Sequence, residues 1–217
     1  MNALIAVTVL LFSIVVHEVA HAWQARREGD DTAERLGRIT LNPIPHLDLF
    51  GSIIVPALLF ATGSGFLFGW AKPVPVNPAN YRDYVGGDIR VSMAGIVSNL
   101  ALALIATLLT AVLAKVDSLG LLSAAVADPL YLALRYALFI NLILAFFNLL
   151  PIPPLDGSHV VAHLLPRELR QAYRQVGQYG ILILIGIMYV VPNAFSVVLW
   201  PVYFLQGLAD RFVRLWI

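Results

Sequence analysis

Five apolar runs, separated by polar loops, constrain the fold of this chain more than any other feature. Each has at least the roughly 20 residues that a helix needs to cross a hydrocarbon core, and they lie at Ala3–Trp23, Leu49–Trp70, Val91–Ala114, Leu130–Leu150 and Tyr179–Leu208. Only 12% of the 217 residues are charged, against about 25% in soluble proteins. The sequence predicts an all-α polytopic membrane protein, a single membrane-embedded domain over residues 1–217 with about four to six transmembrane helices.

The basic residues predict which loops share one side of the membrane. They cluster at Arg26–Arg38, Lys72–Arg90 and Arg167–Arg174, and such clusters favour the cytoplasmic side. The run Leu49–Trp70 lies between two of these clusters, so we expect it to enter the membrane and return as a re-entrant hairpin or short β element after the first helix. A kinked spanning helix stays open as an alternative, because proline and glycine are tolerated in such helices.

Charge and cysteine content exclude several classes of partner and site. The formal net charge is +1, too small to attract nucleic acid through a long-range field. The chain has no cysteine, so any metal must be held by nitrogen and oxygen ligands. We therefore expect the lipid bilayer as a partner and no nucleic acid.

The first run contains a histidine-glutamate motif in an otherwise apolar context. His17, Glu18 and His21 form an H-E-x-x-H pattern. On a helix the two histidines are about 40° apart in azimuth and about 6 Å apart in rise, so both imidazoles can reach one metal ion. An ionisable group in a spanning segment costs at least about 2.5–3.5 kcal/mol unless it is paired or functional. The motif therefore indicates a zinc site with Glu18 beside it.

Asp156 is the best candidate for a third ligand, which a catalytic zinc site needs. It follows a break at Pro151, Pro153 and Pro154, where proline ends the preceding helix. Asp156 can meet the histidines near the inner end of the first span only if an even number of crossings separates them. Three apolar runs intervene, so one of them must fail to cross, and the charges already indicate Leu49–Trp70.

These motifs resemble the site-2 protease family of intramembrane zinc metalloproteases, in its compact bacterial or archaeal form without a recognisable appended domain. The family's H-E-x-x-H signature matches His17–His21, and its N-x-x-P-x-x-x-x-D-G signature matches the stretch from Asn148 to Gly157. A third signature, G-x-x-x-N, matches Gly95 and Asn99. The resemblance extends to about Pro166.

The resemblance implies a function and a role for each matched residue. His17, His21 and Asp156 would bind one Zn²⁺ per chain, and Glu18 would be the catalytic base. The enzyme would hydrolyse peptide bonds within or near transmembrane segments of protein substrates, as a multi-pass cell-membrane protease with its active site near the cytoplasmic side. Gly95 would allow close helix packing, and Asn99 and Asn148 would support the site or the substrate. The sequence predicts no oligomeric state.

Other readings stay open at this stage. A polytopic metal-ion transporter would also place histidine and carboxylate side chains in the membrane, and a catalytically inactive binding protein would retain the same fold. His159 and His163 are four residues apart but have no glutamate between them, so we expect them to pack or to face the interface. His46 is expected to stabilise its loop by a hydrogen bond.

Overall fold

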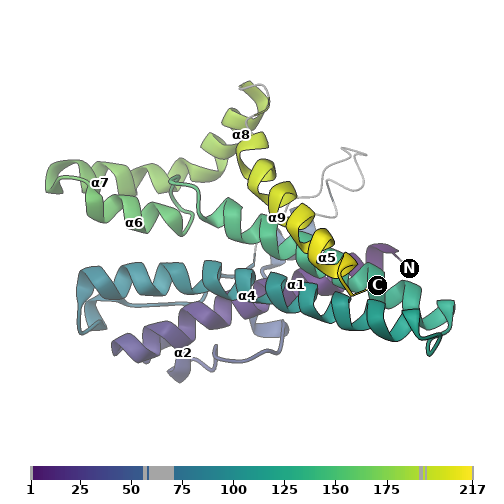
Figure 1. Cartoon of the computed structure of the whole chain (residues 1–217). Coiled ribbons are helices and arrows are strands. Elements are labelled where there is room, and N and C mark those ends of the chain that lie inside the picture. Colours follow the sequence, from purple (N-terminus) through teal and green to yellow (C-terminus); the bar gives the residue numbers. More distant parts are fainter. Residues whose placement is uncertain (1, 56–57, 59–70, 191–192, 194, 217) are drawn as a thin grey trace.

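The computed structural model describes residues 2–55, 58, 71–190, 193 and 195–216. Its described part is helical and contains no strand (Figure 1). The helices are α1 Asn2–Glu28, α2 Thr32–Arg35, α4 Tyr84–Ser118, α5 Ala124–Asn148, α6 Gly157–Leu164, α7 Arg167–Val176, α8 Gly180–Val190 and α9 Ser196–Arg214. Short 3₁₀ turns lie at Ile44–His46, Pro78–Asn80 and Gly177–Tyr179, and a π-helical turn lies at Leu49–Ile54.

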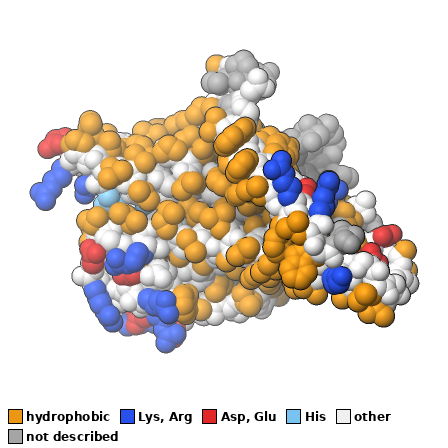
Figure 2. All heavy atoms as spheres, in the orientation of Figure 1, with side chains coloured by type: hydrophobic (Ala, Val, Ile, Leu, Met, Phe, Trp, Pro, Cys, Tyr) orange, Lys and Arg blue, Asp and Glu red, His pale blue; other side chains and the backbone are white. Residues whose placement is uncertain are grey.

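Three helices, α1, α4 and α5, are long and apolar enough to cross a membrane. The predictions of an all-helical fold and of a membrane protein are therefore confirmed. On the face shown in Figure 2, hydrophobic side chains cover the middle and charged side chains gather towards the two ends. Such an apolar surface suits contact with acyl chains, since a lipid-facing surface has no water to hydrate charges.

Helix α4 is much longer than the apolar run Val91–Ala114 that predicts it. Its 35 residues would span about 52 Å at 1.5 Å per residue, against a hydrocarbon thickness of about 30 Å. The extra turns begin at Asp83, whose side chain accepts a hydrogen bond from Gly86 N and so caps the helix. The charged residues Asp88 and Arg90 lie in this polar extension.

Small residues let the spanning helices pack closely. α4 packs against both α1 and α5, and α9 lies against α4 and α5. Ala103 of α4, Leu142 of α5 and Val202 of α9 form one buried cluster, and further alanines of α4 are buried at positions 106, 111 and 114. Small side chains at such interfaces let backbones approach where no hydrophobic effect drives association.

The run Tyr179–Leu208 is not a single spanning helix. Over Tyr179–Leu208 the described residues form two helices, α8 and α9, which run in different directions in Figure 1. Most of the run expected to be re-entrant, at residues 56–57 and 59–70, lies outside the described residues. Its described start, Leu49–Ile54, is a π-helical turn that begins after Asp48, whose side chain accepts from Gly51 N.

Candidate metal centre

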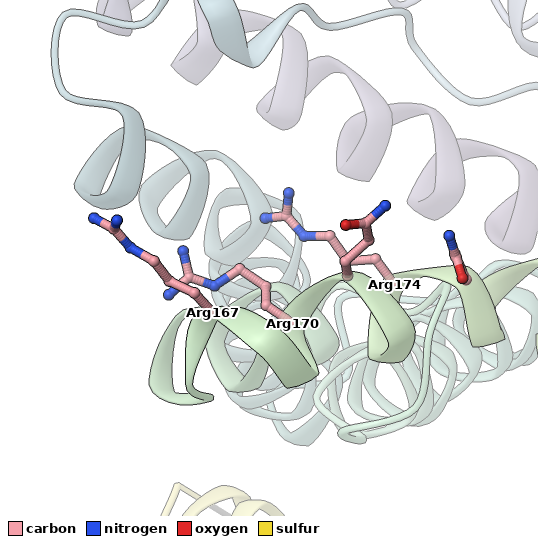
Figure 3. A pocket seen from close by; sticks show the side chains of 5 residues that line it. Arg167, Arg170 and Arg174 are labelled. Atoms are coloured by element: carbon pink, nitrogen blue, oxygen red, sulfur yellow. The ribbon is translucent and has the colours of Figure 1, made fainter.

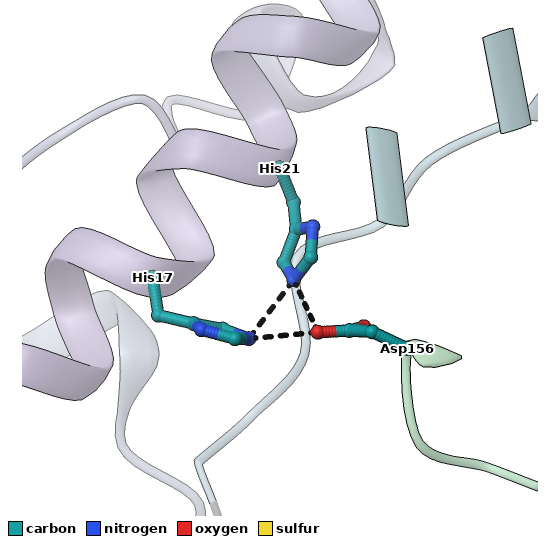
Figure 4. A group of neighbouring side chains, drawn as sticks. All are labelled: His17, His21 and Asp156. Atoms are coloured by element: carbon teal, nitrogen blue, oxygen red, sulfur yellow. Dashed lines mark hydrogen bonds and ion pairs between the residues drawn. The ribbon is translucent and has the colours of Figure 1, made fainter. Parts of the chain in front are cut away.

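His17 and His21 meet Asp156 in a compact group of possible metal ligands (Figure 4). The Nε2 atoms of the two histidines are 3.0 Å apart. Asp156 Oδ2 lies 3.1 Å from Nε2 of His17 and 3.4 Å from Nε2 of His21. Ligand atoms about 2.0 Å from a tetrahedral zinc ion would be separated by about 3.3 Å. The three atoms therefore have the spacing of a zinc ligand set.

The chain reverses sharply to bring Asp156 to this point. Helix α5 ends at Asn148, and α6 begins at Gly157, directly after Asp156. A Cβ atom at Gly157 would lie 2.2 Å from the carbonyl oxygen of Leu149, closer than real Cβ contacts come. Glycine at this position thus allows the reversal. Two candidate spans, α4 and α5, separate His21 from Asp156 among the described residues, which is the even number that the sequence argument required.

A hydrogen bond at Nδ1 orients each imidazole so that its Nε2 faces Asp156. Nδ1 of His17 lies 2.5 Å from the side-chain oxygen of Asn99, and Nδ1 of His21 lies 2.7 Å from the carbonyl oxygen of Val91. Both oxygens accept hydrogen bonds, so each Nδ1 carries a proton, and in the neutral ring Nε2 then presents a lone pair. A hydrogen bond from the nitrogen that does not face the metal is typical of metal-binding histidines.

When both rings are neutral, three electron-rich atoms, the two Nε2 atoms and Asp156 Oδ2, converge with no proton between them. Asp156 Oδ2 is buried, and no hydrogen bond reaches it from the part of the chain that the structure describes. An orphaned carboxylate oxygen facing two imidazole lone pairs is unfavourable unless a cation lies between them. Two nitrogens and one oxygen are also the donors expected of zinc in a chain without cysteine. The residues present fit a resident zinc ion.

Comparisons with known proteins agree with this geometry. The model of "Peptidase family M50" matches residues 119–191. The Bacillus subtilis protein named "Putative zinc metalloprotease YwhC" is 41% identical over 196 residues, which cover 90% of this chain and 84% of that protein. The chain belongs to peptidase family M50. Two proteins named "Putative zinc metalloprotease Rip2" are each 30% identical to this chain. The match with the Mycolicibacterium smegmatis protein covers 82% of this chain and 64% of that protein. The match with the Mycobacterium tuberculosis strain H37Rv protein covers 93% of this chain and 73% of that protein.

No solved structure matches significantly. Family membership confirms the resemblance drawn from the three sequence signatures, and with it the prediction of a zinc metalloprotease. The family model covers Asp156 but not the H-E-x-x-H motif, whereas the alignment with the Bacillus protein extends over nine-tenths of the chain.

Gly95 makes room for the imidazoles of this M50 protease. A Cβ atom there would lie 2.5 Å from Cε1 of His17 and 2.5 Å from Nε2 of His21. Both distances are far below ordinary contact, so any side chain at this position would displace the rings. Close helix packing was the expected role of Gly95, and the structure shows that its close neighbours are the rings of His17 and His21.

Glu18 contacts the segment that follows the Leu49–Trp70 run in the sequence. Its Oε2 atom accepts a hydrogen bond of 2.7 Å from the backbone N–H of Val74. Val74 lies between Pro73 and Pro75, which have no N–H to offer, so it is the donor available at this point of the segment. The sequence does not predict this contact, because a glutamate and a valine backbone N–H do not specify each other as partners.

Buried polar groups hold that segment in place. Arg38 donates from Nη2 to the carbonyl oxygen of Lys72 at 2.9 Å, and Lys72 N donates to the carbonyl of His46. The His46 ring is buried, with Nε2 2.9 Å from the carbonyl oxygen of Thr40. His46 thus makes a loop hydrogen bond of the expected kind.

Asp30 anchors the far end of the same segment. Its carboxylate accepts from Asn77 N, from Asn80 Nδ2 and from the Thr32 hydroxyl. Burial raises the pKa of Asp30, but these hydrogen bonds outweigh burial, so the pKa lies below its usual value and the group is ionised at neutral pH.

The two predicted asparagines differ in their relation to the metal group. Asn99 contacts His17 directly. Asn148 donates from Nδ2 to the carbonyl of Leu144 in its own helix, 3.0 Å away. Among the described residues no bond joins the Asn148 side chain to the metal ligands. Asn141, which the sequence analysis did not single out, is buried and bonds to Asn99.

His159 and His163 lie outside the metal group and bind Asp88 of α4. His159 Nδ1 is 3.1 Å and His163 Nε2 is 2.7 Å from the Asp88 carboxylate, and Arg174 Nη2 is 3.1 Å from it. The described residues contain one group with metal-ligand geometry, and these histidines do not belong to it. They join α6 to α4 through Asp88, a partner that the expectation of packing or an interfacial position did not include.

Arginine side chains of α7 line a hollow of about 530 Å³ (Figure 3), together with two glutamines; its residues are Arg167, Arg170, Gln171, Arg174 and Gln175. Two of these arginines are already engaged in the fold. Arg170 donates from Nε to the carbonyl of Ala162 at 2.9 Å, and Arg174 binds Asp88. The hollow shares no residue with the metal group, and Arg170 and Arg174 fasten α7 to α6 and α4.

Proposed function

We propose that this M50 protease is an intramembrane zinc endopeptidase that cuts transmembrane protein substrates. The observation that carries the proposal is that Asp156 converges with His17 and His21, which lie with Glu18 on a helix long and apolar enough to span a membrane. His17, His21 and Asp156 would hold one zinc ion per chain, and Glu18 would be the catalytic base.

The chemistry divides between the ion and the protein. Bound zinc would polarise the scissile carbonyl and lower the pKa of a coordinated water. The Glu18 carboxylate accepts a proton from the attacking water and then delivers it to the leaving amine nitrogen. The hydrogen bond from Val74 N orients Glu18 for this task. Asn99 and the Val91 carbonyl hold the two imidazoles so that Nε2 faces the site.

The location of the site defines the substrate class. The histidines lie in the C-terminal half of α1, which ends at Arg26, Arg27 and Glu28, so the positive-inside tendency supports a site near the cytoplasmic face of the cell membrane. A helical substrate hides its carbonyls in its own hydrogen bonds and must unwind locally before attack. Substrates should therefore carry weak helix formers near the cut. We also propose that the chain crosses four to six times and that residues 49–70 form a re-entrant element.

The Glu18→Gln variant tests the proposal in liposomes with a model spanning peptide. We expect it to retain zinc and to lose cleavage by about 10²–10⁴-fold, the usual contribution of a general base. Glu34→Gln is the matched control, since Glu34 forms an exposed ion pair with Arg26 and its loss should leave cleavage unchanged.

Two results would reject the proposal. A Glu18→Gln protein that cleaves like the wild type would remove the catalytic base from the mechanism. Zinc flux across the vesicles, without peptide cleavage by either protein, would favour the metal-ion transporter. Metal content should be measured on the same samples by atomic absorption.

A further inference from the structure

A chain of buried amide hydrogen bonds connects the backbone of α5 to the His17 ring. Asn141 Nδ2 donates to the carbonyl oxygen of Ala137 at 2.8 Å. Asn99 Nδ2 donates to Asn141 Oδ1 at 2.7 Å, and Asn99 Oδ1 faces Nδ1 of His17 at 2.5 Å. Asn99 is 0% and Asn141 1% exposed. Three candidate spans, α1, α4 and α5, are thus linked by one polar path.

This path has a single allowed direction. The Ala137 carbonyl can only accept, so the Asn141 group beside it must be the amide nitrogen. The Asn141 oxygen then faces Asn99 and requires a donor there, which turns the Asn99 oxygen towards His17. That oxygen requires a proton on Nδ1 of His17 and leaves Nε2 bare. The polarity of a helix carbonyl in α5 is therefore transmitted to the nitrogen that faces Asp156.

Other bonds within the network do not replace this control. Asn99 Nδ2 also lies 3.5 Å from the carbonyl oxygen of Ser13, a distance at which a hydrogen bond is weak. Asn141 Nδ2 has a second acceptor, the Ser13 hydroxyl, at 2.9 Å, but a hydroxyl can donate or accept and so imposes no direction. The Ala137 carbonyl is the group that fixes the direction.

We propose that Asn141 is a positioning residue that selects the metal-binding tautomer of His17 by orienting the Asn99 amide. The inference rests on His17 being a zinc ligand, as proposed above. Without the Asn141 oxygen, the Asn99 amide loses the acceptor that distinguishes its two orientations. In the flipped orientation its nitrogen faces Nδ1, the ring proton moves to Nε2, and that nitrogen can no longer bind a metal.

The test compares Asn141→Leu with Asn141→Asp in the full-length protein in detergent. Leucine removes the acceptor, and we expect the zinc dissociation constant to rise about 10–100-fold, as when other hydrogen-bond partners of metal ligands are removed. Aspartate, which is protonated in such a buried position, donates its hydroxyl to the Ala137 carbonyl and keeps an oxygen facing Asn99, and we expect zinc affinity within about threefold of the wild type. Affinity is measured by competition with a zinc chelator. Thr107→Val is the matched control, because this buried α4 hydroxyl bonds only to Ala103 of its own helix among the described residues.

A spectroscopic signature separates tautomer control from a general loss of structure. The chain has five histidines, so ¹⁵N-histidine spectra of the zinc-free protein can be assigned with single-histidine variants. We expect His17 to be protonated at Nδ1 in the wild type and in Asn141→Asp, and to show a mixture of both tautomers in Asn141→Leu. If Asn141→Leu does not yield monodisperse helical protein, Asn141→Asp decides alone: at least tenfold weaker zinc binding by folded Asn141→Asp would overturn the proposal.

His17→Ala distinguishes failure of this inference from failure of the proposed function. Unchanged zinc binding by His17→Ala would reject the ligand set itself. Loss of zinc in His17→Ala, together with wild-type affinity and a wild-type His17 tautomer in Asn141→Leu, would leave the ligand set intact and reject the role of Asn141.

Discussion

The protein contains two sites at which an aspartate meets two histidines four residues apart on one helix, and only one of them has the geometry of a metal centre. His17 and His21 of α1 meet Asp156, whereas His159 and His163 of α6 meet Asp88. In the first site both histidines present Nε2. In the second, His159 presents Nδ1 and His163 presents Nε2, and the two rings contact different oxygens of the Asp88 carboxylate.

The second difference is the source of positive charge. Arg174 of α7 places Nη2 3.1 Å from Asp88 and donates from Nη1 to the Tyr84 hydroxyl. The protein thus supplies its own cation at Asp88. At Asp156 no Lys or Arg ion pair is formed within the described part of the chain. The comparison teaches that spacing alone does not define a metal site; the ring nitrogens presented and the absence of a built-in counter-charge do.

Zinc binding should show the largest contrast between the two aspartates. We expect Asp156→Ala to weaken zinc binding by more than about 100-fold and to abolish cleavage. This loss exceeds the one that follows removal of a hydrogen-bond partner of a metal ligand. We expect Asp88→Ala to change zinc affinity by less than about tenfold, because its charge partners are protein groups. Chelator competition measures both. Similar losses from the two substitutions would break the comparison.

Stability should show the reverse order. Asp88→Asn removes the carboxylate that Arg174 and the buried His163 share. The Arg174 side chain is 40% exposed and therefore partly screened by solvent, so we expect a cost of about 1–3 kcal/mol, that of leaving buried polar groups without their partner. Asp31→Asn is the control, since it removes an exposed ion pair with Arg35, worth about 0–1 kcal/mol. Unfolding by denaturant in micelles, followed by circular dichroism, gives both values. Equal midpoints for the two variants would contradict a structural role for Asp88.

The smallest effect is expected at His159. Its side chain is 42% exposed, whereas that of His163 is 2% exposed, so His159→Gln should cost less than about 1 kcal/mol and leave zinc content unchanged. Thermal unfolding and metal analysis on one preparation test this expectation. A drop in zinc content would show that the second histidine pair also supplies a ligand.

The sequence predicted the ligand group because its determinants are local. Spacing within one helix places His17 and His21 on one face, and the proline break predicts where Asp156 can lie. Gly95 and Asn99 came from the family resemblance. Asn141, Asp88 and Val74 were missed because their roles depend on which segments become neighbours, and an asparagine or a backbone N–H in a sequence does not specify its partner.

Helix lengths were predicted less well than helix positions. The apolar run Val91–Ala114 identified α4 but not its polar extension back to Tyr84, since hydropathy ends where charged residues begin while helical hydrogen bonding continues to the Asp83 cap. The sequence does not specify that the run Tyr179–Leu208 divides into α8 and α9, because proline both kinks and ends helices. Most of Leu49–Trp70 lies outside the described residues, so its re-entrant path stays a prediction.

The bare backbone at Gly95 makes the gap between two membrane helices part of the active site. The imidazoles occupy the space that a methyl group at Gly95 would fill. Helix α4 therefore cannot move towards α1 by the width of one carbon atom without displacing these rings. Helices respond to bilayer thickness by tilting. A lipid environment that changes the tilt of either helix would therefore act on the proposed zinc ligands themselves, and the activity proposed for this enzyme should depend on acyl-chain length even when its sequence is untouched.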